Sequence, residues 1–180
     1  MQMHEYENFI VVGADCTGKT TLINLLSDAK SLEVIKGSSF EQSKLPHDQL
    51  LKNFEELAGK RDIIFDRFIY CNYVYATLYE DYAILTEDER RHIESLLSPN
   101  TCIIYLHAPT EVLKERLALR GDEYVDGSNF DEIKSLYSDV LTETGVDIPV
   151  FTFDTSILTA EQIVSFFENE EDEDDERRID

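Results

Sequence analysis

Residues 13–20 read Gly-Ala-Asp-Cys-Thr-Gly-Lys-Thr, and this stretch decides the fold. It matches the pattern G-x-x-x-x-G-K-[ST], in which backbone N–H groups and a lysine surround the phosphates of a nucleotide. An apolar run at residues 9–12 precedes it, and apolar residues at helical spacing follow over residues 22–26. A phosphate-binding loop of this kind needs a strand before it and a helix after it. The sequence therefore predicts that the chain binds a nucleoside triphosphate.

Strand and helix patterns alternate along the rest of the chain. Thr86 and Glu89 have the spacing of a capping box at the start of one predicted helix. The expected strands cover residues 9–12, 32–35, 62–66, 102–106 and 150–153. The expected helices cover the segment after the P-loop and residues 46–57, 68–82, 86–97, 109–119, 130–143 and 159–168. This alternation predicts an α/β fold of three layers, the P-loop NTPase fold, with a five-stranded parallel sheet flanked by helices.

Composition restricts the class of protein further. The 180 residues suit a single domain, expected over 1–168, with an acidic segment at 169–180. No apolar stretch is close to the ~20 residues of a membrane span, so we expect no membrane partner. The three cysteines show no C-x-x-C spacing and predict neither a disulfide framework nor a metal site. A reducing, cytoplasmic location fits them best.

The net charge of −22 is spread unevenly. Residues 168–180 contain nine acidic residues and two arginines. Such a run repels itself and lacks apolar groups, which predicts a disordered tail over 169–180. An acidic chain is also a poor partner for nucleic acid, because contacts to phosphates dominate that affinity. We therefore expect small-molecule substrates.

Asp66 and Arg67 directly follow the third apolar run. Ligands of parallel α/β sheets bind beyond the carboxyl ends of the strands, so both side chains are expected to face the P-loop. Asp66 is suited to organising the water shell of Mg²⁺ or accepting a proton, and Arg67 to bridging the transferring phosphates. A helix-capping aspartate followed by a surface arginine is the alternative.

The stretch that begins at residue 66 resembles the thymidylate kinase signature Asp-Arg-aromatic-x-x-Ser-x-x-Ala-Tyr. Residues 66–76 read Asp-Arg-Phe-Ile-Tyr-Cys-Asn-Tyr-Val-Tyr-Ala, with Cys71 in place of the usual serine. Residues 105–109 and 115–117 are similar to the fourth strand and lid of that family. The likeness extends over nearly residues 8–167 and implies a compact, phage-like member of the thymidylate kinase and deoxynucleoside kinase superfamily. It also implies a short lid, allows a homodimer, and places the protein in the host cytoplasm if it is phage-encoded.

One motif of thymidylate kinases is absent. They usually follow the second strand with Arg-Glu-Pro, whose arginine grips the monophosphate, whereas residues 35–38 here read Ile-Lys-Gly-Ser. Lys36 and Lys44 are then the cationic substitutes beside Arg67. Phe40 and Phe54 are candidate rings for stacking on the base, although Phe54 also fits an apolar core stripe.

Phosphoryl transfer requires positioning of the phosphates and neutralisation of their charge. Lys19 is expected to contact the β- and γ-phosphates, and the Thr20 hydroxyl to bind Mg²⁺ together with Asp66. Arg116 and Arg120 lie four residues apart, so they are candidates for compensating transition-state charge, with a solvated helix face as the alternative. The residues expected to hold ATP are Gly13, Ala14, Asp15, Cys16, Thr17, Gly18, Lys19, Thr20 and Thr21.

By the same resemblance, the acceptor lies beside the tyrosine-rich helix after Arg67. Asn72 meets the base, since a carboxamide can pair with the N3–H and a carbonyl of a pyrimidine. Tyr75 packs where a ribose 2′-OH would sit, unless it belongs to an aromatic core stripe. The residues expected to bind the substrate are Asp15, Lys36, Phe40, Arg67, Asn72 and Tyr75.

The function that these features predict is ATP- and Mg²⁺-dependent phosphorylation of a deoxynucleoside monophosphate, dTMP or a related pyrimidine. A deoxynucleoside kinase that acts on an unphosphorylated nucleoside is the near alternative, and the missing Arg-Glu-Pro motif favours it. Glu41 resembles only weakly the glutamate that acts as the base in those enzymes. A nucleotide-binding switch or ATPase module is the second alternative. The sequence lacks the Asn-Lys-x-Asp motif that gives GTPases their specificity for guanine, which counts against a GTPase.

Overall fold

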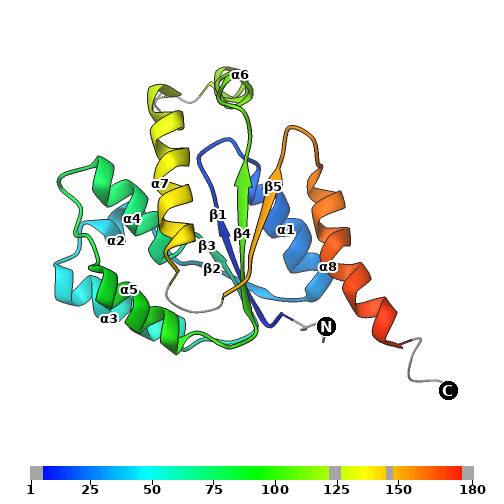
Figure 1. Cartoon of the computed structure of the whole chain (residues 1–180), viewed down its shortest axis with the longest axis horizontal. Helices are drawn as coiled ribbons and strands as arrows, with labels where there is room; N and C mark the ends of the chain where they lie inside the picture. Colours follow the sequence, from blue (N-terminus) through cyan, green and yellow to red (C-terminus); the bar gives the residue numbers. More distant parts are fainter. Residues whose placement is uncertain (1–5, 122–126, 145–147, 176–180) are drawn as a thin grey trace.

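Five parallel strands form the centre of the molecule, in the order β2-β3-β1-β4-β5 (Figure 1). The computed structural model describes residues 6–121, 127–144 and 148–175, with side chains through 168. The strands are β1 (Asn8–Val12), β2 (Glu33–Lys36), β3 (Ile63–Asp66), β4 (Thr101–His107) and β5 (Val150–Asp154). The predicted α/β fold with a five-stranded parallel sheet is confirmed.

Helices cover both faces of this sheet (Figure 1). They are α1 (Lys19–Lys30), α2 (Phe40–Ser43), α3 (His47–Ala58), α4 (Ile69–Leu78), α5 (Glu87–Leu96), α6 (Thr110–Arg120), α7 (Phe130–Thr142) and α8 (Ala160–Asp175), with a 3₁₀ turn η1 (Gly127–Asn129). None of the described helices is both long and apolar enough to cross a membrane.

The alternation of side chains along β1 explains the two helical layers. Phe9 and Val11 point to one face and pack in the cluster that contains residues of α1 and α8. Ile10 and Val12 point to the other face and join the larger cluster formed with α3, α4, α5 and α7. All five residues of β1 are buried, as expected for a central strand of a parallel sheet.

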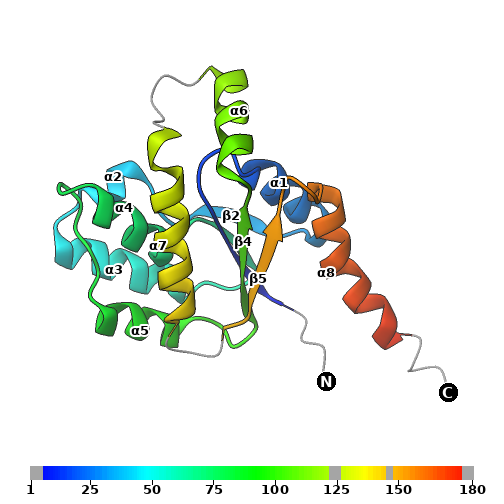
Figure 2. The same ribbon diagram turned by 45° about the horizontal axis from the view of Figure 1, so that its top comes forward.

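The carboxyl ends of the strands form the edge at which a ligand can bind. The P-loop leaves β1 at this edge, and Asp66 ends β3 there. Helix α6 follows β4 and stands above the same edge, next to α7 (Figure 2). The segment after Gly121 was expected to act as a lid, and residues 122–126 lie outside the described residues.

Two predicted helix ends differ from the structure, and one helix was not predicted. Helix α4 ends at Leu78 rather than near residue 82, because the chain turns back toward α4 over residues 79–85. The short helix α2 was not predicted; its N-cap Ser39 accepts a hydrogen bond from the backbone N–H of Gln42. Helix α8 was expected to end near residue 168 and continues to Asp175. The part of the predicted disordered tail at 176–180 lies outside the described residues.

Candidate active site

The backbone of the P-loop has the tight geometry that its glycines allow. Gly13 and Gly18 have φ of 150° and 89°, and Cys16 between them has φ of 65°. A Cβ atom at Gly13 would stand 2.3 Å from the Leu106 carbonyl oxygen of β4, so no other residue fits there. Gly18 is the N-cap of α1, which places the loop at the positive end of that helix.

Lys19 is folded onto the P-loop. Its Nζ donates hydrogen bonds to the carbonyl oxygens of Gly13 at 2.8 Å and Ala14 at 2.6 Å. The side chain is buried, and this burial, with a smaller contribution from the nearby Arg67, lowers the pKa of Lys19 to about 8. An anion at this point favours the charged ammonium.

A cavity of about 420 Å³ lies in front of the P-loop, and we call it the phosphate cavity. Arginines from α6 and the residues that end β3 complete its wall. Its lining residues are Asp15, Cys16, Gly18, Lys19, Thr20, Thr21, Asp66, Arg67, Arg116 and Arg120. Of the residues expected to hold ATP, Gly13, Ala14 and Thr17 do not line this cavity, and the carbonyl oxygens of Gly13 and Ala14 accept hydrogen bonds from Lys19.

A second cavity of about 420 Å³ opens between β2, α2 and α4, and we call it the acceptor cavity. Two cations, one at the end of β2 and one just after β3, and four aromatic rings contribute to its wall. Its lining residues are Lys36, Ser38, Ser39, Phe40, Glu41, Ser43, Asp66, Arg67, Cys71, Tyr75, Tyr79 and Tyr82. The predicted residues Lys36, Phe40, Arg67 and Tyr75 are thus brought together, and Tyr79 and Tyr82 were missed.

Asp66 and Arg67 line both cavities. The Arg67 guanidinium donates to the Asp15 carboxylate at 2.9 Å and lies over the Tyr75 ring, 5.4 Å from its centroid. Arg67 has φ of 67°, a strained conformation for a residue with a side chain. Strain of this kind is concentrated at functional sites, and here it aims Arg67 at the junction of the cavities.

The segment after β2, where thymidylate kinases usually have Arg-Glu-Pro, contains Gly37. The Gly37 N–H donates to the Asp66 carbonyl oxygen at 3.0 Å, and a Cβ atom there would lie 2.0 Å from the Arg67 carbonyl oxygen. The chain after β2 therefore approaches the backbone of Asp66 and Arg67 too closely for any residue except glycine. Lys36, just before it, is left as the cation that β2 contributes.

A third cavity, of about 230 Å³, lies between the P-loop and the start of α8. It shares Cys16, Gly18, Thr21 and Arg116 with the phosphate cavity, so the two are adjacent. Its lining residues are Cys16, Thr17, Gly18, Thr21, Leu22, Leu106, Arg116, Thr155, Leu158, Thr159, Ala160 and Ile163. Apolar walls next to a phosphate site suit the base of a nucleotide.

Arg116 links the P-loop to the segment after β5. Its guanidinium donates to the Cys16 carbonyl oxygen at 3.1 Å and to the hydroxyl and carbonyl oxygens of Thr155 at 2.9 and 2.7 Å. The alternative of a solvated helix face is therefore wrong for Arg116. Arg120, one turn later, also lines the phosphate cavity.

The structure contradicts the predicted role of Asn72 in reading the base. Its Nδ2 donates to the Ala83 carbonyl oxygen at 2.8 Å, and its Oδ1 accepts from the Leu85 N–H at 3.1 Å. The side chain is 2 % exposed and does not line the acceptor cavity. Asn72 instead holds the returning chain against α4. Phe54 likewise belongs to the core, where its ring meets Phe68 edge-on.

We expect Asn72→Ala to destabilise the protein without changing substrate affinity. It removes the partners of the buried Leu85 N–H and the half-buried Ala83 carbonyl oxygen, which costs about 2–3 kcal/mol and lowers Tm by about 5–10 °C. Thermal unfolding and the KM values check this, with the half-buried Asn53→Ala on α3 as a matched control. A raised KM for pyrimidine monophosphates at unchanged Tm would restore the base-reading role.

Comparison with known proteins gives one relative of high identity. No family model matches the sequence. The SPbeta prophage-derived uncharacterized protein YorR of Bacillus subtilis (strain 168) is 40 % identical over 154 residues, which are 86 % of this chain and 92 % of YorR. A crystal structure of YorR from Bacillus subtilis, in complex with phosphorylated GDP, superposes with a TM-score of 0.82 at 39 % identity and covers 88 % of this chain and 91 % of YorR.

More distant solved structures share the fold. Deoxyadenosine kinase from M. mycoides with bound dCTP has a TM-score of 0.57 at 19 % identity, covering 92 % of this chain and 99 % of that one. Thymidylate kinase from Candida albicans has a TM-score of 0.59 at 18 % identity, covering 92 % and 90 %. The fold is thus that of P-loop nucleoside and nucleotide kinases. The identity to YorR shows the family: the chain belongs to the same family as the YorR protein of the Bacillus subtilis SPbeta prophage.

Proposed function

We propose that this protein is a nucleotide kinase that transfers the γ-phosphoryl group of ATP to a deoxynucleoside monophosphate. The main support is that Asp66 and Arg67 line both the phosphate cavity and the acceptor cavity. A phosphoryl group that is transferred from one cavity to the other would lie beside the Arg67 guanidinium throughout. Positioning and charge neutralisation of this kind are what phosphoryl transfer requires.

The phosphate cavity suits the triphosphate of ATP and a magnesium ion. Lys19 would contact the β- and γ-phosphates, and Arg120 would compensate charge that develops on the transferred group. Thr20 and Asp66 offer oxygen atoms on the wall of the same cavity, which is the ligand type that Mg²⁺ takes beside phosphates. The ion would supply charge neutralisation, while Lys19 and Arg67 hold the phosphates in line.

The acceptor cavity suits a monophosphate better than a neutral sugar hydroxyl. Lys36 and Arg67 supply two cations on the wall of this cavity. Phe40 and Tyr82, whose rings meet edge-on at 5.9 Å, offer aromatic surface for a base. With Asn72 used elsewhere, dTMP is supported by the resemblance alone. YorR is described with a guanine nucleotide, so purine acceptors belong in the test.

A deoxynucleoside kinase is the second candidate, because Glu41 lines the acceptor cavity. Its carboxylate is ionised at neutral pH like that of an ordinary glutamate, and hydrogen bonds from its own backbone N–H and from Ser39 lower its pKa, which makes it a weaker base. An ionised carboxylate there can accept the proton of a sugar hydroxyl.

A panel of acceptors tests both candidates. ADP release is measured with MgATP and each of the four deoxynucleosides and their 5′-monophosphates. We expect turnover with at least one monophosphate and none with the nucleosides. Turnover with a nucleoside alone would favour the second candidate, in which case Glu41→Gln should abolish it. ADP release that no acceptor increases would indicate an ATPase or a switch instead of a kinase.

ATP affinity should depend on pH through Lys19. The pKa of Lys19 is lowered to about 8 in the free protein, and phosphates raise it because they favour the charged form. Affinity is therefore full below pH 7, where Lys19 is already charged, and falls as the pH rises above 8. Calorimetry from pH 6.5 to 9.5 measures this, with proton uptake near pH 8. Lys19→Ala should bind weakly with no such fall, and an equal fall in both proteins would contradict the assignment.

A further inference from the structure

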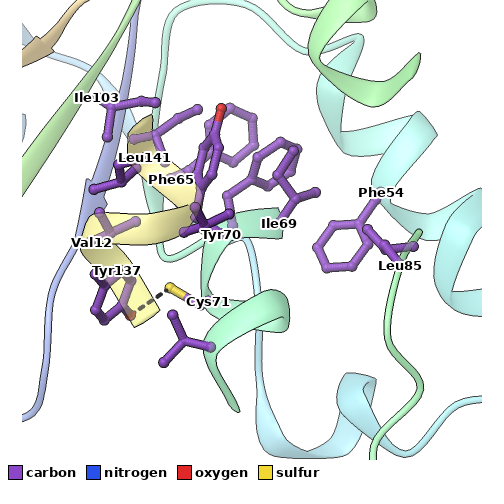
Figure 3. Packing of buried hydrophobic residues seen from close by; sticks show 14 of the residues in the cluster. Val12, Phe54, Phe65, Ile69, Tyr70, Cys71, Leu85, Ile103, Tyr137 and Leu141 are labelled. Atoms are coloured by element: carbon purple, nitrogen blue, oxygen red, sulfur yellow. Dashed lines mark hydrogen bonds between the residues drawn. The ribbon is translucent and has the colours of Figure 1, made fainter. Parts of the chain in front are cut away.

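The hydroxyl of Tyr137 is buried behind the P-loop, where the proposed reaction does not use it. Tyr137 lies on α7 and is 0 % exposed. Its Oη donates to the Gly13 carbonyl oxygen at 3.3 Å and lies 3.2 Å from the Cys71 Sγ of α4 (Figure 3). Because the single phenol proton is directed at Gly13, the phenol oxygen accepts from the Cys71 thiol. Tyr137 thus joins the P-loop, α4 and α7.

The same Gly13 carbonyl oxygen accepts a second and shorter hydrogen bond. Its donor is Lys19 Nζ, at 2.8 Å, which also donates to the Ala14 carbonyl oxygen at 2.6 Å. Phosphates that bind in front of the loop therefore compete with two carbonyl oxygens for one ammonium group. The cost of moving Lys19 depends on what remains bound to those oxygens, since a buried carbonyl without a donor is unfavourable.

Each of the two carbonyl oxygens has a second donor. The Ala14 oxygen accepts from the Thr17 hydroxyl at 2.8 Å, and the Gly13 oxygen accepts from Tyr137. Both donors are fully buried, and neither hydrogen bond involves the lysine side chain. Thr17 belongs to the P-loop itself, whereas Tyr137 comes from a helix more than 100 residues away.

We propose that Tyr137 is a positioning residue for Lys19: its hydroxyl stays on the Gly13 carbonyl oxygen and so frees the lysine ammonium to bind the triphosphate. Cys71 fixes the phenol from the opposite side. The inference rests on the proposed use of the P-loop as the ATP site and is independent of which acceptor is phosphorylated.

Tyr137→Phe tests this, because it removes one oxygen atom and keeps the ring. We expect the Kd for MgATP, measured by calorimetry without an acceptor, to rise about five- to tenfold, the usual effect of one hydrogen bond. Tyr105→Phe is the matched control: its ring lies 5.5 Å from that of Tyr137, and the described residues show no hydrogen bond from its hydroxyl to the P-loop. That variant should bind MgATP like the wild type.

Testing Tyr137→Phe in the Lys19→Ala variant distinguishes an effect through Lys19 from a general effect on the fold. In Lys19→Ala, the further change Tyr137→Phe should alter the Kd less than twofold, because the group that it positions is gone. An equal loss in both backgrounds would overturn the proposal. Cys71→Ser keeps a donor to the phenol and should retain affinity, whereas Cys71→Ala should lose part of it. A protein that binds MgATP but phosphorylates no acceptor refutes the proposed function alone, and one that does not bind MgATP refutes both.

Discussion

Lys19→Ala should reduce kcat by about 10²- to 10³-fold and leave a folded protein. Lys19 Nζ contacts the P-loop backbone directly and would neutralise charge as the γ-phosphoryl group is transferred. Removing it should not unfold the chain, because the Gly13 and Ala14 carbonyl oxygens keep Tyr137 and Thr17 as donors. Steady-state kinetics with the acceptor found in the panel measures the effect.

The control for this variant is Lys52→Ala, which removes an exposed lysine from α3 and changes the net charge by the same amount. It should keep full turnover, so any loss specific to Lys19→Ala reports on the site. Thermal unfolding of both variants should give Tm values within a few degrees of the wild type. Wild-type turnover in Lys19→Ala would rule out phosphoryl transfer at the P-loop.

Arg67→Ala should lower kcat/KM for the acceptor by about 10³-fold or more, because the guanidinium lies between the two cavities. The loss should appear in both kcat and the acceptor KM, with a smaller effect on the KM for ATP. Arg67→Lys keeps the charge but lacks the planar fork that can bind two phosphates, so it should recover only part of the activity. Equal effects on the KM values of ATP and acceptor would argue against a bridging position.

The backbone of Arg67 allows a second comparison at the same position. Its φ of 67° is strained for any residue with a Cβ atom, by about 1–2 kcal/mol, and is not strained for glycine. Arg67→Gly should therefore unfold about 2–8 °C above Arg67→Ala, although both are inactive. Equal Tm values would mean that the surrounding chain relaxes to remove the strain.

Much of the fold could be predicted because its signals are local. The five strands were found from short apolar runs, and the capping box of Thr86 and Glu89 forms as predicted, at 3.2 and 2.8 Å. The P-loop was found because glycines at 13 and 18 are required by backbone geometry that neighbouring residues alone determine. The position of Asp66 and Arg67 followed from a general property of parallel sheets, whose strands all end at one edge.

The sequence could not show which polar side chains face a cavity and which hold the chain together. Asn72 and Tyr75 are three residues apart on α4, yet Asn72 binds residues 83 and 85 while Tyr75 lines the acceptor cavity. The difference arises from the path of the chain after Leu78, which no motif in α4 encodes. Tyr79 and Tyr82 were missed although they follow Tyr75 at positions i+4 and i+7, because the sequence does not show that this face borders a cavity.

By itself, the sequence determined the α/β class, the phosphate-binding loop and the charged pair at the end of β3, because each depends on residues adjacent in the chain. The tertiary structure alone decided the partners of those residues. Arg116 binds the P-loop from 100 positions away, and Tyr137 binds Gly13 from 124 positions away. Contacts at such separation depend on how the helical layers pack on the sheet, and packing is set by the summed shape of many side chains rather than by any one motif.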